Sequence, residues 1–198
     1  MSKVCSLVTM MKKNHLFGFV LLTLSVAALL VSARDILIRE VDYKSNADYV
    51  KVFIKIRNGT DKVRSSVVDI DALWQRDVTD GVLVHLDLAS KMGAEYRTLL
   101  SSTVDVCSLN VSKSTDPLMR LLVGEMNKYG NMTVDCPLHS GNYVVRNFRI
   151  NRENMLIKMA PPGEYRVGID VKHKMEQSKP AVPIFDIEFY ANVVADKA

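Results

Sequence analysis

Cysteine is scarce in this sequence, with three residues among 198, which excludes a small scaffold held together by several disulfides. Catalytic signatures are absent too: there is no Gly-x-Ser-x-Gly, no His-Glu-x-x-His, no phosphate-binding glycine-rich loop and no cluster with metal-ligand spacing. Only His139-Ser140, paired with a distant carboxylate, leaves a hydrolytic triad open, because triads assemble in space. We therefore expect no enzymatic activity, no cofactor and no metal site.

Long apolar runs are confined to the first 33 residues. Two lysines precede an apolar stretch over 16–31, and small residues lead up to Ala33, so the pattern predicts a signal peptide over 1–33 that is cleaved before Arg34. The stretch is shorter than the roughly 20 residues that a membrane span needs, so we expect no stable membrane span. The mature protein is then one domain over 34–198, secreted and extracellular.

A charge excess of one sign is also missing from the mature chain. Removal of the signal peptide takes away three lysines and no acidic residue, so the formal net charge falls from +4 to +1. A near-neutral domain has no general attraction for nucleic acid or anionic membranes. Arg146, Arg149 and Arg152 do not show the repeated aromatic interleaving expected of a single-strand binder, and on a strand the first two face opposite sides. We interpret them as a solvated face, with a site for an anionic headgroup as the alternative, and expect no nucleic-acid partner.

Two cysteines remain after cleavage, Cys107 and Cys136, and two thiols allow one intramolecular pairing. In the oxidising export pathway a disulfide between them is the default, and two buried free thiols are the alternative. Three sequons also agree with secretion. They predict glycosylation at Asn58, Asn110 and Asn131.

Alternation of apolar and polar residues predicts strands along most of the mature chain. In one example, Val82, Val84 and Leu86 alternate with His85 and Asp87. The expected strands are 36–43, 50–56, 66–73, 82–88, 96–106, 143–150, 165–173 and 185–193. About eight strands are enough for a two-sheet β-sandwich, so we expect a mainly β fold.

One amphipathic helix is expected between the fifth and sixth strands. Asp116 is a favourable cap and Pro117 suits the first helical position. Apolar residues then recur at three- and four-residue steps up to Tyr129. Gly130 follows, where a left-handed residue commonly ends a helix. The sequence therefore predicts a helix over 117–129, flanked by the two cysteines.

An ordered series of short motifs runs through the central and C-terminal parts of the chain. The motifs are Thr103-Val104-Asp105-Val106-Cys107, Asp116-Pro117-Leu118, Lys128-Tyr129-Gly130-Asn131, Cys136-Pro137, Gly141-x-Tyr143, Asn147-Phe148-x-Ile150 and Pro162-Gly163-Glu164-Tyr165-Arg166. Together they resemble a large, insect-expanded family of secreted domains of unknown function that includes the CheA and CheB chemosensory proteins. That family is similar to the ML lipid-recognition sandwiches, such as the ganglioside activator protein.

The resemblance implies an immunoglobulin-like, ML-type sandwich whose sheets separate to hold a lipid or another small hydrophobic ligand. It also implies a role as a carrier or binding protein, with chemosensation and pheromone detection among the settings. On this basis we expect the pocket wall to contain Phe148, Ile150, Phe185, Ile187 and Phe189, although a solid core would show the same alternation. The alternative is an extracellular protein-interaction module, or an accessory subunit of a cell-surface receptor, without a small-molecule ligand.

Overall fold

The computed structural model describes residues 34–58, 65–107, 124, 127–132, 136–150, 155–175 and 180–195. Residues 34–195 form one compact unit. The expected signal peptide, Asn110 and most of the expected helix over 117–129 lie outside the described residues. Within that helix range Gly124 is helical, and residues 127–129 form a turn.

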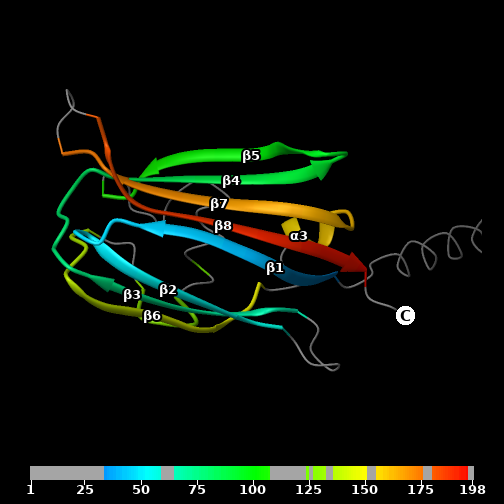
Figure 1. Ribbon diagram of the computed structural model, residues 1–198, viewed down its shortest axis with the longest axis horizontal. Helices are drawn as coiled ribbons and strands as arrows, with labels where there is room; N and C mark the ends of the chain where they lie inside the picture. Colours follow the sequence, from blue (N-terminus) through cyan, green and yellow to red (C-terminus); the bar gives the residue numbers. More distant parts are fainter. Residues whose placement is uncertain are drawn as a thin grey trace, which may run out of the picture. The chain divides into compact units, whose positions relative to one another are not determined.

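Eight strands form two antiparallel sheets (Figure 1). The five-stranded sheet has the order β1-β8-β7-β4-β5 and the three-stranded sheet has the order β2-β3-β6. The strands are β1 (Arg34–Ser45), β2 (Val50–Arg57), β3 (Val67–Trp74), β4 (Val82–Met92), β5 (Glu95–Asp105), β6 (Gly141–Phe148), β7 (Gly163–His173) and β8 (Val182–Ala195). A five-residue helix, α3 (Met155–Met159), lies between β6 and β7 in the sequence. The prediction of a mainly β fold with eight strands is confirmed.

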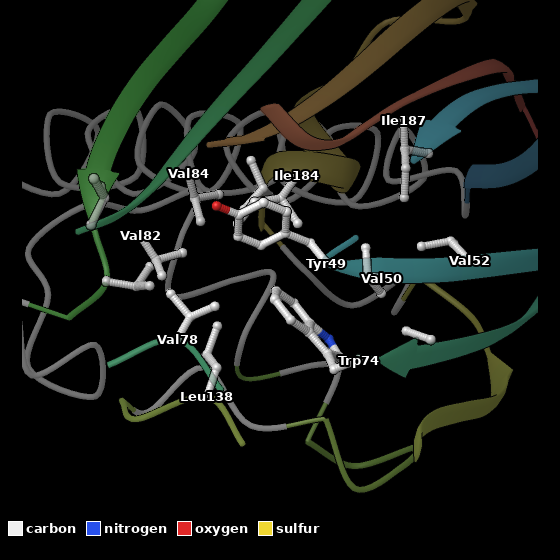
Figure 2. Close-up of a cluster of buried hydrophobic side chains, with 14 of the residues drawn as sticks. Tyr49, Val50, Val52, Trp74, Val78, Val82, Val84, Leu138, Ile184 and Ile187 are labelled. Atoms are coloured by element: carbon white, nitrogen blue, oxygen red, sulfur yellow. The ribbon is translucent and has the colours of Figure 1, made fainter. Parts of the chain in front are cut away.

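The two sheets bury their apolar faces in shared core clusters, which is the arrangement of a β-sandwich. Figure 2 shows the larger cluster, in which Val50 and Trp74 of the three-stranded sheet meet Val84, Ile184 and Ile187 of the five-stranded sheet. A second cluster contains Ile36, Ile38, Val68, Tyr165, Ala191 and Val193. Phe189 packs against both clusters. The strand period of two explains this division, because successive side chains point to opposite faces of a sheet.

Register shifts interrupt the regular pairing at three places that matter below. One falls in β1 between Ile38 and Glu40, opposite β8. Another falls between Leu88 and Ala89 where β4 pairs with β5. The third falls between Val68 and Ile70 where β3 pairs with β6. Such bulges bend a strand and increase its local twist, so they shape the faces on which sites form.

Gly130 has a different role from the predicted one. It does not have the positive φ of a left-handed helix cap, whereas Gly81 and Gly93 do. Instead, residues 129–131 run beside β6, with the Asn131 N–H donating to the Val144 carbonyl and the Arg146 N–H donating to the Tyr129 carbonyl. A Cβ on Gly130 would lie 1.8 Å from the Val144 carbonyl oxygen. The glycine therefore permits close approach of two backbones, and the prediction of a left-handed cap is wrong.

Candidate functional site

Two consecutive serines connect the sheets where β1 passes the start of β3. The Ser66 hydroxyl accepts a 2.8 Å hydrogen bond from the Ile38 N–H, and the Ser65 hydroxyl accepts one of 3.3 Å from the Ile36 N–H. The Ser66 N–H donates to the Ile36 carbonyl. The Ser65 hydroxyl in turn donates to the buried carboxylate of Asp35. These bonds satisfy polar groups of both sheets at a buried junction, where an unpaired group would be costly.

A small pocket of about 10 Å³ lies beside this junction. Its wall combines the two serines with apolar side chains of β1, β3 and β6 and with Ile150, which follows β6. The wall residues are Ile36, Ile38, Ser65, Ser66, Val68, Phe148 and Ile150. The volume is about what a single water molecule needs. The pocket is therefore a mainly apolar site between the sheets, with hydroxyl groups at one side.

The surroundings of the pocket are apolar and partly exposed. Ile157 of α3 and Ala160 pack against the cluster that contains the pocket. The Tyr129 ring meets the Phe148 ring edge to face, with the centroids 5.5 Å apart. Leu88 packs against the same cluster and pairs across the strands with Leu100, which is 38% exposed. An exposed apolar side chain therefore lies directly across the strand pair from a residue that packs on the cluster.

The five residues predicted as pocket wall fall into two groups. Phe148 and Ile150 line the pocket. The other three lie on β8 and face the three-stranded sheet: Phe185, Ile187 and Phe189. Of these, Ile187 is buried in the larger cluster. Phe189 is partly buried and connects the two clusters.

Sequence reasoning missed the β1 and β3 side of the pocket. Ile36, Ile38 and Val68 carry the same alternation as ordinary core residues, so periodicity alone does not mark them. Ser65-Ser66 directly before an apolar strand was the available signal, because small hydroxyl residues at the start of a strand commonly bond to backbone groups.

His139 and Ser140 both contact one carboxylate, that of Asp77. The His139 Nδ1 lies 3.4 Å from Asp77 Oδ2, and the Ser140 backbone N–H donates to Asp77 Oδ1 at 2.6 Å. The Ser140 backbone bond, together with the Ser140 and His139 side chains, lowers the pKa of Asp77. In a hydrolytic triad the histidine bridges the serine and the carboxylate, whereas here the carboxylate bridges the other two. The arrangement is a loop-stabilising contact.

Cys107 and Cys136 form a disulfide, as predicted. No group of three or more histidine, cysteine or acidic side chains in the described part of the chain could hold a metal ion. Among the same residues, no helix has the length and apolar character needed to cross a membrane.

Part of the chain is similar to a protein family that has no assigned function. Residues 84–167 match the family described as "Protein of unknown function (DUF1091)". No curated protein matches the chain. Among solved structures, the C-terminal domain of wzt is similar, with 11% sequence identity over 80% of each chain and a TM-score of 0.36. The family match runs from β4 into β7 and contains both cysteines, Phe148 and Ile150.

Two of the three predicted glycosylation sites fall in the described part of the chain. Asn58 is exposed at the end of β2, and its side-chain oxygen accepts a hydrogen bond from the Ser66 hydroxyl. Asn131 is also exposed, but both ends of its amide bond the β6 backbone, at Asn142 and Val144. Glycosylation at these positions stays a prediction.

Proposed function

We propose that this chain is a secreted binding or carrier protein for a lipid or another small hydrophobic ligand, held between the sheets of an ML-like sandwich. The observation that carries the proposal is the apolar pocket between the sheets, whose wall includes Phe148 and Ile150. Ligand pockets in proteins are mainly apolar with a few placed polar groups. The two serine hydroxyls beside an apolar wall have this character.

A lipid chain needs more room than about 10 Å³, so binding requires the pocket to widen. Two features support widening on the Phe148 side. The side chain of Phe148 is only half-buried, and the nearby helix α3 has only five residues. The β1 side is held by the serine bonds described above. A ligand would therefore enter past Phe148 and α3 and leave the β1–β3 junction intact.

Secretion is the second part of the proposal. A disulfide is typical of proteins that fold in an oxidising compartment, and the sequence begins with a predicted signal peptide. The resemblance to an insect-expanded secreted family supports a role in carrying hydrophobic cues, with pheromone detection as one setting.

Native mass spectrometry of the full chain secreted from insect cells, with organic extraction of the same sample, tests the function. We expect a reproducible co-purified lipid or hydrocarbon, or saturable binding of added fatty acids. The N-terminus of the secreted protein reports cleavage before Arg34 in the same experiment. A ligand-free mass that added fatty acids and hydrocarbons do not change would contradict the carrier function.

An exposed apolar pair favours a second candidate, a protein-interaction module. Phe53 is 65% exposed and Leu73 is 45% exposed, and both lie on the outer face of the three-stranded sheet. They are diagonal neighbours across β2 and β3, a spacing at which long side chains touch. Loss of a protein partner on Phe53→Ala, without any bound small molecule in the wild type, would favour this candidate over the carrier.

A further inference from the structure

A larger cavity, of about 220 Å³, lies on the outer face of the five-stranded sheet. Tyr190, Ala191 and Asn192 of β8 line it. The side chains of Tyr190 and Asn192 alternate with those of Phe189, Ala191 and Val193, which pack into the core between the sheets. Because successive strand residues face opposite sides, this cavity is separated from the apolar pocket by the sheet itself. At about 30 Å³ for each water molecule, its volume corresponds to roughly seven waters.

All five strands of the sheet contribute to the cavity wall. The polar and aromatic wall residues are Arg39 and Glu40 (β1), Tyr190 and Asn192 (β8), Glu164 (β7), Lys91 (β4) and Tyr96 (β5). Arg39 sits at the register shift in β1, and Tyr96 lies just before the shift between β4 and β5. Bulges bend and twist strands, so the bulges at this end of the five-stranded sheet make its outer face concave.

The charged groups of the wall neutralise one another. Glu164 accepts a 2.9 Å hydrogen bond from Lys91, and its other oxygen lies 3.4 Å from Arg39. The Lys91 hydrogen bond lowers the pKa of Glu164, and the same bond raises the pKa of Lys91. Glu40 is the fourth charged wall residue, so two cations face two carboxylates. A wall with no net charge favours a neutral ligand over an anion or a cation.

The two tyrosines are held in place before any ligand arrives. Their rings meet edge to face, with centroids 5.8 Å apart. The Arg166 guanidinium lies over the Tyr96 ring at 5.9 Å and also pairs with Asp87 and Glu188. The Tyr190 hydroxyl donates a 2.6 Å hydrogen bond to Glu188. Fixed aromatic side chains lose little conformational entropy when a ligand binds, which favours affinity.

One buried polar atom of the wall has no partner within the described structure. The Asn192 Oδ1 is buried and accepts no hydrogen bond. An acceptor buried in this way costs about 1–3 kcal/mol. A turn of the Asn192 side chain would bring this oxygen to the cavity, where an O–H donor of a bound molecule would remove that cost.

We propose that this outer-face cavity binds a sugar ring, as a free saccharide or as the end of a glycan. A sugar ring is neutral, has C–H surfaces that pack on tyrosine rings, and has hydroxyls that both donate and accept. Its hydroxyls would donate to Asn192 Oδ1 and accept from Lys91 or Arg39. The volume and the neutral wall match one ring rather than an extended lipid or a phosphate.

Saturation-transfer NMR on the secreted full chain, with neutral hexoses, N-acetylhexosamines and uronic acids, tests the free sugars. A glycan array tests the glycan source. We expect saturable binding of at least one neutral saccharide on one of these platforms. A chain that is folded, as judged by its unfolding transition, but binds no neutral saccharide on either platform would overturn the proposal. A preference for uronic acids over neutral sugars would also overturn it.

Two variants and two controls locate the site. Tyr96→Ala and Asn192→Leu should each weaken saccharide binding by about tenfold or more, as expected for loss of a packed ring or a hydrogen bond to a buried group. Asn192→Leu should leave thermal stability unchanged or higher, because it removes an unpaired buried acceptor.

Tyr43→Ala, which changes an exposed tyrosine of β1 outside the cavity, is the matched control. Phe148→Ala should leave saccharide binding unchanged. Failure of the saccharide proposal is therefore distinguishable from failure of the carrier function. Unchanged binding in both cavity variants would overturn the assignment.

Discussion

Cys107 and Cys136 join the two sheets at the side opposite the β1–β3 junction. Cys107 follows β5, the last strand of the five-stranded sheet, and Cys136 precedes β6, the last strand of the three-stranded sheet. The serine bonds hold one side of the sandwich and the disulfide holds the other. The pocket beside Phe148 therefore lies in a unit that is connected at both sides.

Loss of the disulfide should destabilise the protein without changing its fold. The bond closes a loop with a sequence separation of 29 residues, for which the chain-entropy model gives about 3–4 kcal/mol. We expect the double variant Cys107→Ser/Cys136→Ser to lose about that free energy of unfolding, measured by urea titration. Labelling of the denatured wild type with iodoacetamide, without reduction, checks the bond itself. Labelling at both positions would show that it does not form.

The two glycines with the closest contacts should respond differently to alanine. In Gly130→Ala the new Cβ meets the Val144 carbonyl oxygen at 1.8 Å, so the backbone of β6 must move. We expect a loss of about 1–3 kcal/mol or more in the free energy of unfolding. In Gly168→Ala the new Cβ meets Asp87 Oδ1 at 2.1 Å, so the Asp87 side chain must rotate, which weakens its ion pair with Arg166. Because only a side chain has to move, this change should cost less than Gly130→Ala. Equal losses in thermal unfolding would show that the 129–131 segment does not pack on β6.

Asn147 should tolerate glycine better than a β-branched residue. It has a φ of 56° at the β3–β6 bulge, and its side chain accepts a 2.8 Å hydrogen bond from Arg57. Asn147→Gly keeps the backbone conformation and loses one exposed bond, so we expect a cost below about 1 kcal/mol. Asn147→Val adds left-handed strain of about 1–2 kcal/mol. Urea unfolding of both variants checks the order, and the reverse order would contradict it.

Much of the strand pattern was predictable because it depends on local alternation. The alternation of Phe185, Ile187 and Phe189 predicted β8, and the strand and its inward face are confirmed. The expected range of 185–193 was shorter than the observed strand, because Val182-Pro183 at its start does not alternate clearly. Element ends depend on pairing partners, which periodicity does not identify.

The sites were less predictable, because they combine strands that are distant in the sequence. The outer cavity brings Arg39 beside Glu164 and Tyr96 beside Tyr190, and no local pattern marks such pairs. The bulge at Asn147 likewise depends on the partner strand, where Asp69 accepts the Asn147 N–H. The misassigned Gly130 shows the same limit, since its role depends on contact with Val144.

Acid stability should depend on Asp69. Its carboxylate accepts a 2.7 Å bond from the Asn147 N–H and bonds to Arg57, and the Asn147 bond is the main cause of its lowered pKa. A lowered carboxyl pKa gives stability that is fully present above the ordinary value of 3.8 and is lost as the pH falls through the folded value. Asp69→Asn should therefore reduce the free energy of unfolding at pH 7. It should also make that free energy fall less steeply as the pH drops below 3.8. Urea unfolding across that pH range is the measurement.

Asp186 is the matched control for Asp69, because its pKa moves in the opposite direction. Partial desolvation, with the neighbouring Asp170 and Glu188 carboxylates, raises the pKa of Asp186. A carboxyl with a raised pKa opposes folding at neutral pH, and that cost disappears as the pH falls below the ordinary value. Asp186→Asn should therefore increase stability at pH 7. A decrease for Asp186→Asn, or an unchanged acid profile for Asp69→Asn, would contradict the assigned contacts.

Replacement of Phe148 distinguishes a ligand pocket from a solid core. Phe148→Ala should weaken binding of a fluorescent fatty acid with a modest effect on unfolding, because the side chain is only half-buried at the pocket wall. Ile184→Ala, at a fully buried position, should cost about 2–5 kcal/mol and leave the affinity of the folded protein unchanged. Phe53→Ala, on the outer face of the three-stranded sheet, should change neither quantity. If Phe148→Ala instead costs about 3–5 kcal/mol and leaves fatty-acid binding intact, Phe148 is a core residue. The space between the sheets is then not where a lipid is held.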